Sequence, residues 1–231
     1  MTSARGIVAL MVLGGIGYAF EASLFFAALE RAPAGVVALV FYSYPLWTAV
    51  IALVLRLEPF RWNLLLALLM GTAGILTIFS IPSGNTAGVL LALGSAVAVA
   101  IYLVGAQVFT KGIDAAVSST WTAAGAAVSL SFVVLIGGGD LPASSLPYAA
   151  GLGLATALAF AGLYAAVTRI GSSRTAIATM VEPVTTVVLA WMLLNEPITG
   201  RVFIGMILIV SALPILAAAS PERPGVAADT V

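Results

Sequence analysis

The sequence contains no cysteine and no histidine, and only 8% of its 231 residues are charged. The absence of cysteine excludes disulfide bonds and thiolate metal sites. The absence of histidine removes the most common general base, the usual zinc ligand and every Ser-His catalytic pair. Nine cations and nine anions cancel, so there is no electrostatic case for a nucleic-acid partner. These absences argue against a soluble enzyme and against a metal or nucleic-acid site.

Hydrophobic residues, in contrast, make up 62% of the chain and are grouped in long blocks. A helix needs about 20 mainly apolar residues to cross a bilayer. The first block is too long for a signal peptide and contains Glu21, so we interpret it as a retained helix. The sequence therefore predicts an all-α, polytopic membrane bundle of about eight transmembrane helices. We expect these helices near residues 6–28, 34–56, 62–80, 87–110, 118–136, 147–168, 174–194 and 201–219.

The charges in the loops indicate the orientation. With eight spans both termini lie on one side, and that side carries seven of the nine cations, whereas only Arg31 and Arg201 lie on the other. Lys and Arg in short loops are retained in the cytoplasm. We therefore expect a multi-pass protein of the cell membrane (the bacterial cytoplasmic membrane), surrounded by lipid bilayer, with both termini cytoplasmic. Residues 220–231 are expected to form a disordered tail.

An internal repeat is visible without gaps at an offset of 138 residues. Between residues 27 and 59, 11 of 33 positions are identical to those 138 residues later. Identity is common by chance in helices rich in Ala, Leu and Val, so the rarer residues carry the signal. The matching rare residues are Arg31 and Arg169, Pro45 and Pro183, Glu58 and Glu196, and Pro59 and Pro197.

The repeated helices are the second and the seventh, so they cross the membrane in opposite directions. Such an inverted-topology repeat is a common architecture of secondary transporters, in which one repeat rocks against the other. Pro45 and Pro183 lie in the middle of these helices, where each removes a backbone hydrogen bond. A lone proline here is equally well explained as a packing kink. Two symmetry-related prolines favour a hinge role for both.

These motifs resemble those of a known family. Each repeat has a mid-helix proline, a Glu-Pro pair at the helix end and a following helix with small residues seven apart, which are Ala67 and Gly74, and Gly205 and Ala212. In these features the chain resembles the EamA-like branch of the drug/metabolite transporter superfamily. The resemblance implies a metabolite or drug carrier of ten helices, arranged as two inverted halves of five.

The chain departs from that plan because three helices precede the loop at 81–86 and five follow it. Residues 1–80 then form an N-terminally incomplete first repeat, and residues 87–219 form the second. The first two helices of the family plan have no counterpart. An incorrectly assigned start codon is the preferred explanation, and a fragment or a genuine eight-helix variant remains open.

Two acids lie deep inside predicted helices, Glu21 in the first and Glu182 in the seventh. An ionised carboxylate in hydrocarbon costs about 2.5 kcal/mol or more, so both should face the bundle interior or a wet cavity. Either could bind a cationic substrate group or a coupling proton. The alternative is a protonated carboxyl group that only bonds a neighbouring helix.

Polar and aromatic side chains share faces with these acids. Thr175, Thr179, Glu182 and Thr186 follow one another at helical spacing, although threonine also bonds its own helix. Tyr18, Glu21 and Phe25 form a similar face.

Tyr44, Trp47 and Tyr102 lie at mid-depth, where an aromatic wall suits an amphipathic solute. Trp62, Trp121 and Tyr148 lie near helix ends and are better explained as interfacial residues. Glu58 and Glu196 are expected to cap the helices that follow them.

The sequence thus predicts a secondary transporter, of exporter type, for a small organic metabolite or drug. It would work by alternating access, either linked to protons or driven by another gradient, and no cofactor or metal is expected. The expected partners are the solute, protons and lipid, and a second copy of the chain is also a candidate. The alternative is a truncated membrane subunit that does not transport and needs a partner. Enzyme chemistry is not expected, because no nucleophile constellation, phosphate loop or pair of acids one turn apart occurs.

Overall fold

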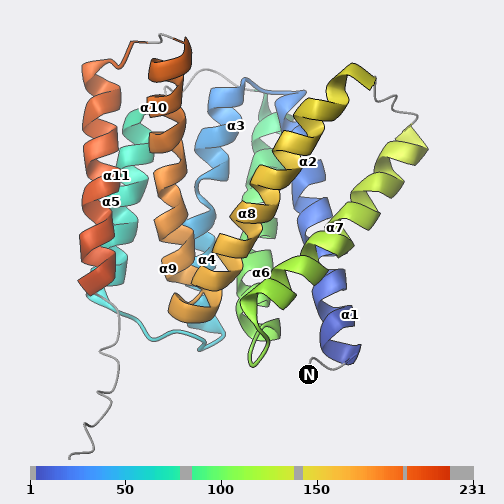
Figure 1. Cartoon of the computed structure of the whole chain (residues 1–231). Helices are drawn as coiled ribbons and strands as arrows, with labels where there is room; N and C mark the ends of the chain where they lie inside the picture. Colours follow the sequence, from blue (N-terminus) through green and yellow to red (C-terminus); the bar gives the residue numbers. More distant parts are fainter. Residues whose placement is uncertain (1–3, 79–84, 138–142, 195–196, 219–231) are drawn as a thin grey trace, which may run out of the picture.

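The computed structural model describes residues 4–78, 85–137, 143–194 and 197–218, in which every regular element is a helix (Figure 1). The predicted polytopic all-α bundle is therefore confirmed. Its α-helices are α1 (Ala4–Val12), α2 (Ala19–Leu29), α3 (Ala34–Phe41), α4 (Tyr44–Val54), α5 (Trp62–Ile78), α6 (Thr86–Phe109), α7 (Ala115–Gly137), α8 (Leu146–Ile170), α9 (Ser172–Ala178), α10 (Glu182–Leu194) and α11 (Gly200–Ala218).

These helices combine into eight apolar segments, close to those expected from the sequence. Seven are long and apolar enough to cross a membrane within the described residues, and the eighth, α5, is shorter at 17 residues. The predicted tail at 220–231 and Glu196 lie outside the described residues.

Three of the eight spans are not continuous α-helices, which the hydrophobic pattern did not predict. The first contains a π-helical segment, Leu13–Tyr18, between α1 and α2. The second is broken at Tyr42 and Ser43 between α3 and α4, and the seventh has a 3₁₀ turn, Thr179–Val181, between α9 and α10. Both later interruptions end just before a proline, Pro45 or Pro183. A proline fits the first turn of a helix because its missing N–H is not needed there.

Helices α5 and α11, which the 138-residue offset also relates, pack side by side and run in opposite directions (Figure 1). Small residues bring their backbones together. A Cβ added to Gly74 would lie 2.7 Å from the carbonyl oxygen of Gly205, and one added to Gly205 would lie 2.8 Å from that of Gly74. Small residues at these positions allow the two helices to approach closely in a membrane.

A second close backbone contact joins the first span to α7. A Cβ on Gly14 would collide with the carbonyl oxygen of Thr122, and one on Gly125 would collide with that of Met11. Such small residues allow helices to approach closely in a membrane. The contact holds the first span, and with it Glu21, against the second half of the chain.

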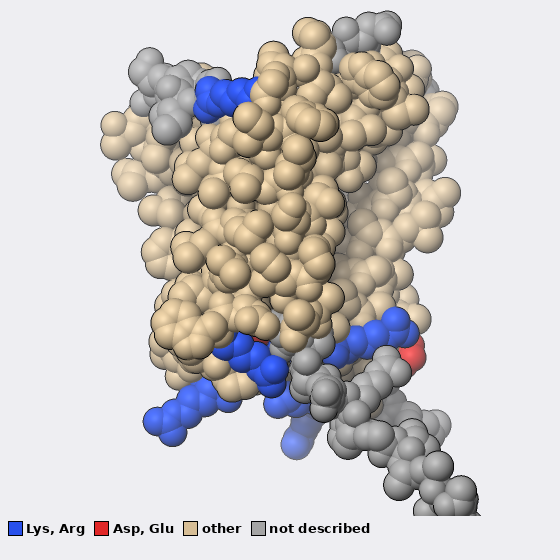
Figure 2. Space-filling model, turned by 90° about the vertical axis from the view of Figure 1, so that its left-hand side faces the viewer, with Lys and Arg blue, Asp and Glu red and all other residues tan. Residues whose placement is uncertain are grey.

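On the face that Figure 2 shows, the Lys and Arg side chains lie at the two ends of the bundle, with an uncharged band between them. Ala4 and Ala218, the first and last described residues, lie at the same end (Figure 1). Of the described cations, Arg31 and Arg201 belong to the opposite end, at the α2–α3 loop and the start of α11. The band matches the hydrocarbon layer that the composition requires.

Candidate functional site

Glu21 lies in the first turn of α2, directly after the π-helical segment, and only 7% of its surface is exposed. The Ser95 hydroxyl of α6 donates a hydrogen bond to its carboxylate at 3.0 Å. π-helical segments are often found at functional sites. This segment ends at Tyr18, which lines the same cavity as Glu21.

Glu182 is the first residue of α10, where the 3₁₀ turn ends and Pro183 follows. Its side chain is exposed, unlike that of Glu21. The Tyr42 hydroxyl donates a hydrogen bond to its carboxylate. Tyr42 lies in the break between α3 and α4, so this bond connects the second span to the seventh.

The two acids line the same cavity, which has a volume of about 390 Å³. Helices α2, α3, α4, α6, α8 and α10 all contribute to its wall, together with the 3₁₀ turn before α10. The lining residues are Tyr18, Glu21, Ala22, Phe25, Phe26, Phe41, Tyr44, Val99, Leu103, Leu163, Thr179 and Glu182. The fold thus brings together two carboxyl groups that lie 161 positions apart in the sequence.

An aromatic wall lies along the cavity. Phe25 and Phe41 pack edge to face with ring centroids 5.0 Å apart, and Phe41 and Tyr44 lie 5.3 Å apart. The Tyr44 hydroxyl of the second span is hydrogen-bonded to the Thr179 hydroxyl of the seventh. Tyr44 also interacts electrostatically with both Glu182 and Glu21. Tyr44 therefore belongs to both the aromatic and the polar parts of the site.

Tyr102 is buried beside the cavity and is not among its lining residues. Its hydroxyl donates to the Tyr164 hydroxyl at 3.1 Å, which donates in turn to Thr122 at 2.8 Å. These residues lie within about two helical turns of the ends of α6 and α8 and the start of α7. That is the end of the bundle at which Ala4 lies (Figure 1). The three hydroxyls join three helices at the depth of Leu103 and Leu163, which line the cavity.

Two other residues expected at the site lie elsewhere. Trp47 is 38% exposed, and its indole N–H donates to Ser43 at 3.2 Å in its own span. The Thr186 hydroxyl donates to the backbone carbonyl of Glu182 at 3.1 Å. Neither residue is among those that line the cavity. Each of these bonds stays within its own span. Helical spacing alone therefore did not separate the residues that line the cavity from their neighbours.

Glu58 caps a helix, but it is α9 of the second half and not the α5 helix that follows it. Its carboxylate accepts hydrogen bonds from the Ser173 backbone N–H at 3.1 Å and the Ser172 hydroxyl at 3.4 Å. The Gln107 side chain accepts from the Ser172 N–H at 2.8 Å. Gly171 makes this approach possible, because its φ is +85° and an added Cβ would lie 2.5 Å from the Glu58 oxygen.

Removal of this cap should weaken the contact between the two halves. We expect Glu58→Ala to lose about 1–2 kcal/mol of stability, because the Ser173 backbone N–H and the Ser172 hydroxyl lose their acceptor. The melting temperature should fall by roughly 2–8 °C, measured by scanning fluorimetry on the purified protein. Glu30→Ala is the matched control, since Glu30 is exposed and its ion pair among the described residues is with its neighbour Arg31. Equal melting temperatures for the two variants would contradict the capping role.

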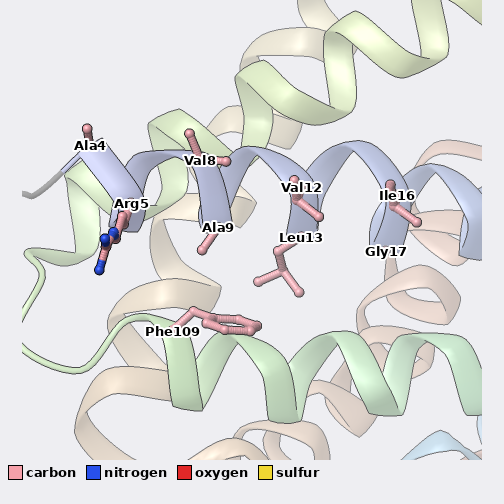
Figure 3. A pocket seen from close by; sticks show the side chains of 9 residues that line it. All are labelled: Ala4, Arg5, Val8, Ala9, Val12, Leu13, Ile16, Gly17 and Phe109. Carbon is pink, nitrogen blue, oxygen red and sulfur yellow. The ribbon is translucent and has the colours of Figure 1, made fainter.

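A larger cavity of about 650 Å³ lies between α1 and the end of α6 (Figure 3). Leu13 and Phe109 point into the space between the two helices, and Arg5 lies at one end. Apart from Arg5, the side chains that line it are apolar. It has none of the acids or hydroxyls of the smaller cavity, so it does not have the features of a site for a polar solute.

Sequence reasoning missed several residues of the site. Ser95, Phe41 and Tyr164 were not identified, and Phe25 was noted only as a neighbour of Glu21 on one face. Ser95 is a small polar residue in an otherwise apolar helix, a weak signal because serine often bonds its own backbone. Phe41 cannot be distinguished by type from lipid-facing phenylalanines. Only the packing of the helices identifies them.

Comparisons with known proteins agree with this architecture. A sequence model of the EamA-like transporter family matches residues 2–80 and again residues 86–217. One similar solved structure is a crystal structure of a protein that shares 23% sequence identity, with a TM-score of 0.78 over 89% of this chain and 76% of that chain. At this identity the similarity shows the fold alone. No curated protein matches the sequence.

Proposed function

This chain belongs to the EamA-like transporter family, and on that premise we propose that it is a secondary transporter of a small organic metabolite or drug. Transport would proceed by alternating access and be linked to protons. The observation that carries the proposal is the shared cavity, in which Glu21 of the first half faces the same space as Glu182 of the second. A site contributed by both halves changes its exposure when one half rocks against the other.

The two carboxyl groups support proton linkage. Removal of a carboxyl group from water favours its neutral form, and a bound cation or renewed contact with water favours the charged form. Glu21 is buried while Glu182 is exposed, so the two groups differ in their contact with solvent. A carrier that alternates between two sides needs a group whose proton affinity changes with access.

The interrupted helices support the alternating motion. Spans broken near mid-depth let their two halves move separately, and they are a recurrent feature of transporter binding sites. The Glu58 cap lies at the end of the bundle where Ala4 lies, and the Tyr102–Tyr164–Thr122 bonds join three helices beside the cavity. We interpret these contacts as the closed gate of that end. From the loop charges we assign this end to the cytoplasm and the protein to the bacterial cytoplasmic membrane.

The proposal is tested with the purified chain in proteoliposomes that contain a pH-sensitive dye. A metabolite and drug library is added outside under an imposed pH gradient. We expect at least one solute to cause dye responses that are absent from protein-free liposomes and abolished by a protonophore. Solute movement that is insensitive to the pH gradient would contradict proton linkage, and no movement of any solute would contradict transport.

One observation favours the alternative, a subunit that needs a partner. Gly15 in the first span is packed against α7, and a Cβ there would lie 2.8 Å from Ser129. Gly153 in α8 is its counterpart at the 138-residue offset, and a Cβ there would meet nothing within 4 Å in the described part of the chain. The symmetry thus leaves one face of α8 uncovered. Flux by the purified chain alone would exclude this alternative.

A further inference from the structure

We propose that the cavity between Glu21 and Glu182 binds organic cations, specifically a protonated amine that carries a small apolar or aromatic body. This rests on the proposed function, since a carrier binds its solute at the site that both halves share. The inference follows from three properties of the cavity, which are its charge, its aromatic wall and its size.

The charge of the lining favours a cation. Two of the lining residues are carboxylic acids, and none is Lys or Arg. The chain has no histidine, and on the face that Figure 2 shows the Lys and Arg side chains lie at the ends of the bundle. An anionic solute would face two acids without a counter-charge. A zwitterion would leave its own carboxylate unpaired, which is costly away from water.

The acids also retain capacity for a ligand. An ionised carboxylate accepts about four hydrogen bonds. Ser95 donates one to Glu21 and Tyr42 donates one to Glu182. Lone pairs therefore remain on both groups for an ammonium ion, which has up to three N–H donors.

The aromatic wall fits the same class. Phe25, Phe41 and Tyr44 form a continuous row of rings between α2 and α4, with successive centroids 5.0 and 5.3 Å apart. Ring faces attract cations, and the same rings bury the apolar body of an amine. A cavity of about 390 Å³ falls at the small end of the range for ligand pockets, so the body is of the size of a single ring.

The test uses four probes with similar bodies and different charges: phenethylammonium, L-phenylalanine, 3-phenylpropionate and 2-phenylethanol. Binding to the full chain in lipid nanodiscs is measured by calorimetry at neutral pH. We expect phenethylammonium to bind at least tenfold more tightly than each of the other three. Equal or weaker binding of the cation would overturn the proposal.

Variants separate the site from non-specific attraction to the membrane. Glu182→Gln should lower phenethylammonium affinity at least tenfold, and Phe41→Leu should lower it about threefold because an apolar contact remains without the ring face. Glu30→Gln removes the same charge at an exposed loop position and should leave the affinity unchanged. An equal loss in Glu30→Gln and Glu182→Gln would overturn the assignment to this cavity.

The outcome for the substrate class is separable from that for transport. Tight binding of phenethylammonium without any flux in proteoliposomes would support the cation site and contradict the transporter. Proton-dependent flux of L-phenylalanine without binding of phenethylammonium would support the transporter and overturn the cation site.

Discussion

Glu182→Gln is expected to reduce proton-driven transport by about 100-fold while the protein still inserts and folds. The amide carries no proton and no negative charge at physiological pH, so it can neither couple transport to protons nor attract a cation. Glu182 is a sharper target than Glu21, because its side chain is exposed at the start of α10 whereas Glu21 is 7% exposed and bonded to Ser95. Its substitution should therefore disturb packing less.

The measurement is the initial rate of solute flux in proteoliposomes under an imposed pH gradient. Glu182→Asp, which keeps the carboxyl group on a shorter side chain, is the matched variant and should retain more flux than the amide. A single symmetrical peak in size-exclusion chromatography establishes that each variant is folded. Wild-type flux and pH response in a folded Glu182→Gln protein would remove Glu182 from the mechanism.

Gly125→Val is expected to cause a large loss of stability. A Cβ at Gly125 would collide with the backbone carbonyl of Met11, and a backbone cannot move aside as a flexible side chain does. Overpacking of this kind costs about 3 kcal/mol or more, because the first span must separate from α7. For a chain of this length, we expect the melting temperature to fall by about 10 °C.

Gly153→Val is the matched control in α8, because a Cβ there meets nothing within 4 Å among the described residues. Its melting temperature should stay within about 2 °C of the wild type. Scanning fluorimetry in detergent compares the two variants. Similar losses for both would show that the face of α8 is packed in the purified protein, and would favour the subunit that needs a partner.

The spans were predictable because each depends on its own residues. An apolar segment of sufficient length enters a membrane as a helix whatever its neighbours are, since its backbone groups must bond internally. The predicted segments 87–110 and 201–219 therefore lie within one residue of α6 and α11 at both ends. The interruptions were not predicted, because Pro45 and Pro183 mark a weak point in a helix without specifying how it breaks.

The site was only partly predictable. Glu21 and Glu182 were identified because acids in an apolar span are costly wherever they point. Trp47 was expected at the cavity for its depth, yet its indole bonds Ser43 in its own span. Glu58 was expected to cap α5 and instead caps α9, 114 residues further along the chain. These differences depend on the rotation and tilt of each helix, which local sequence does not encode.

Composition and local pattern alone thus determine that this chain is an eight-helix membrane bundle. They also reveal the repeat and the bias of charge between the two ends. What only the tertiary structure decided is which side chains meet. Close contacts such as Gly14 on Thr122 and Gly74 on Gly205 set the positions of the spans. Those contacts bring Glu21, Glu182 and Tyr44 to one cavity. Each helix by itself determines whether it enters the membrane, whereas packing between helices determines which side chains meet.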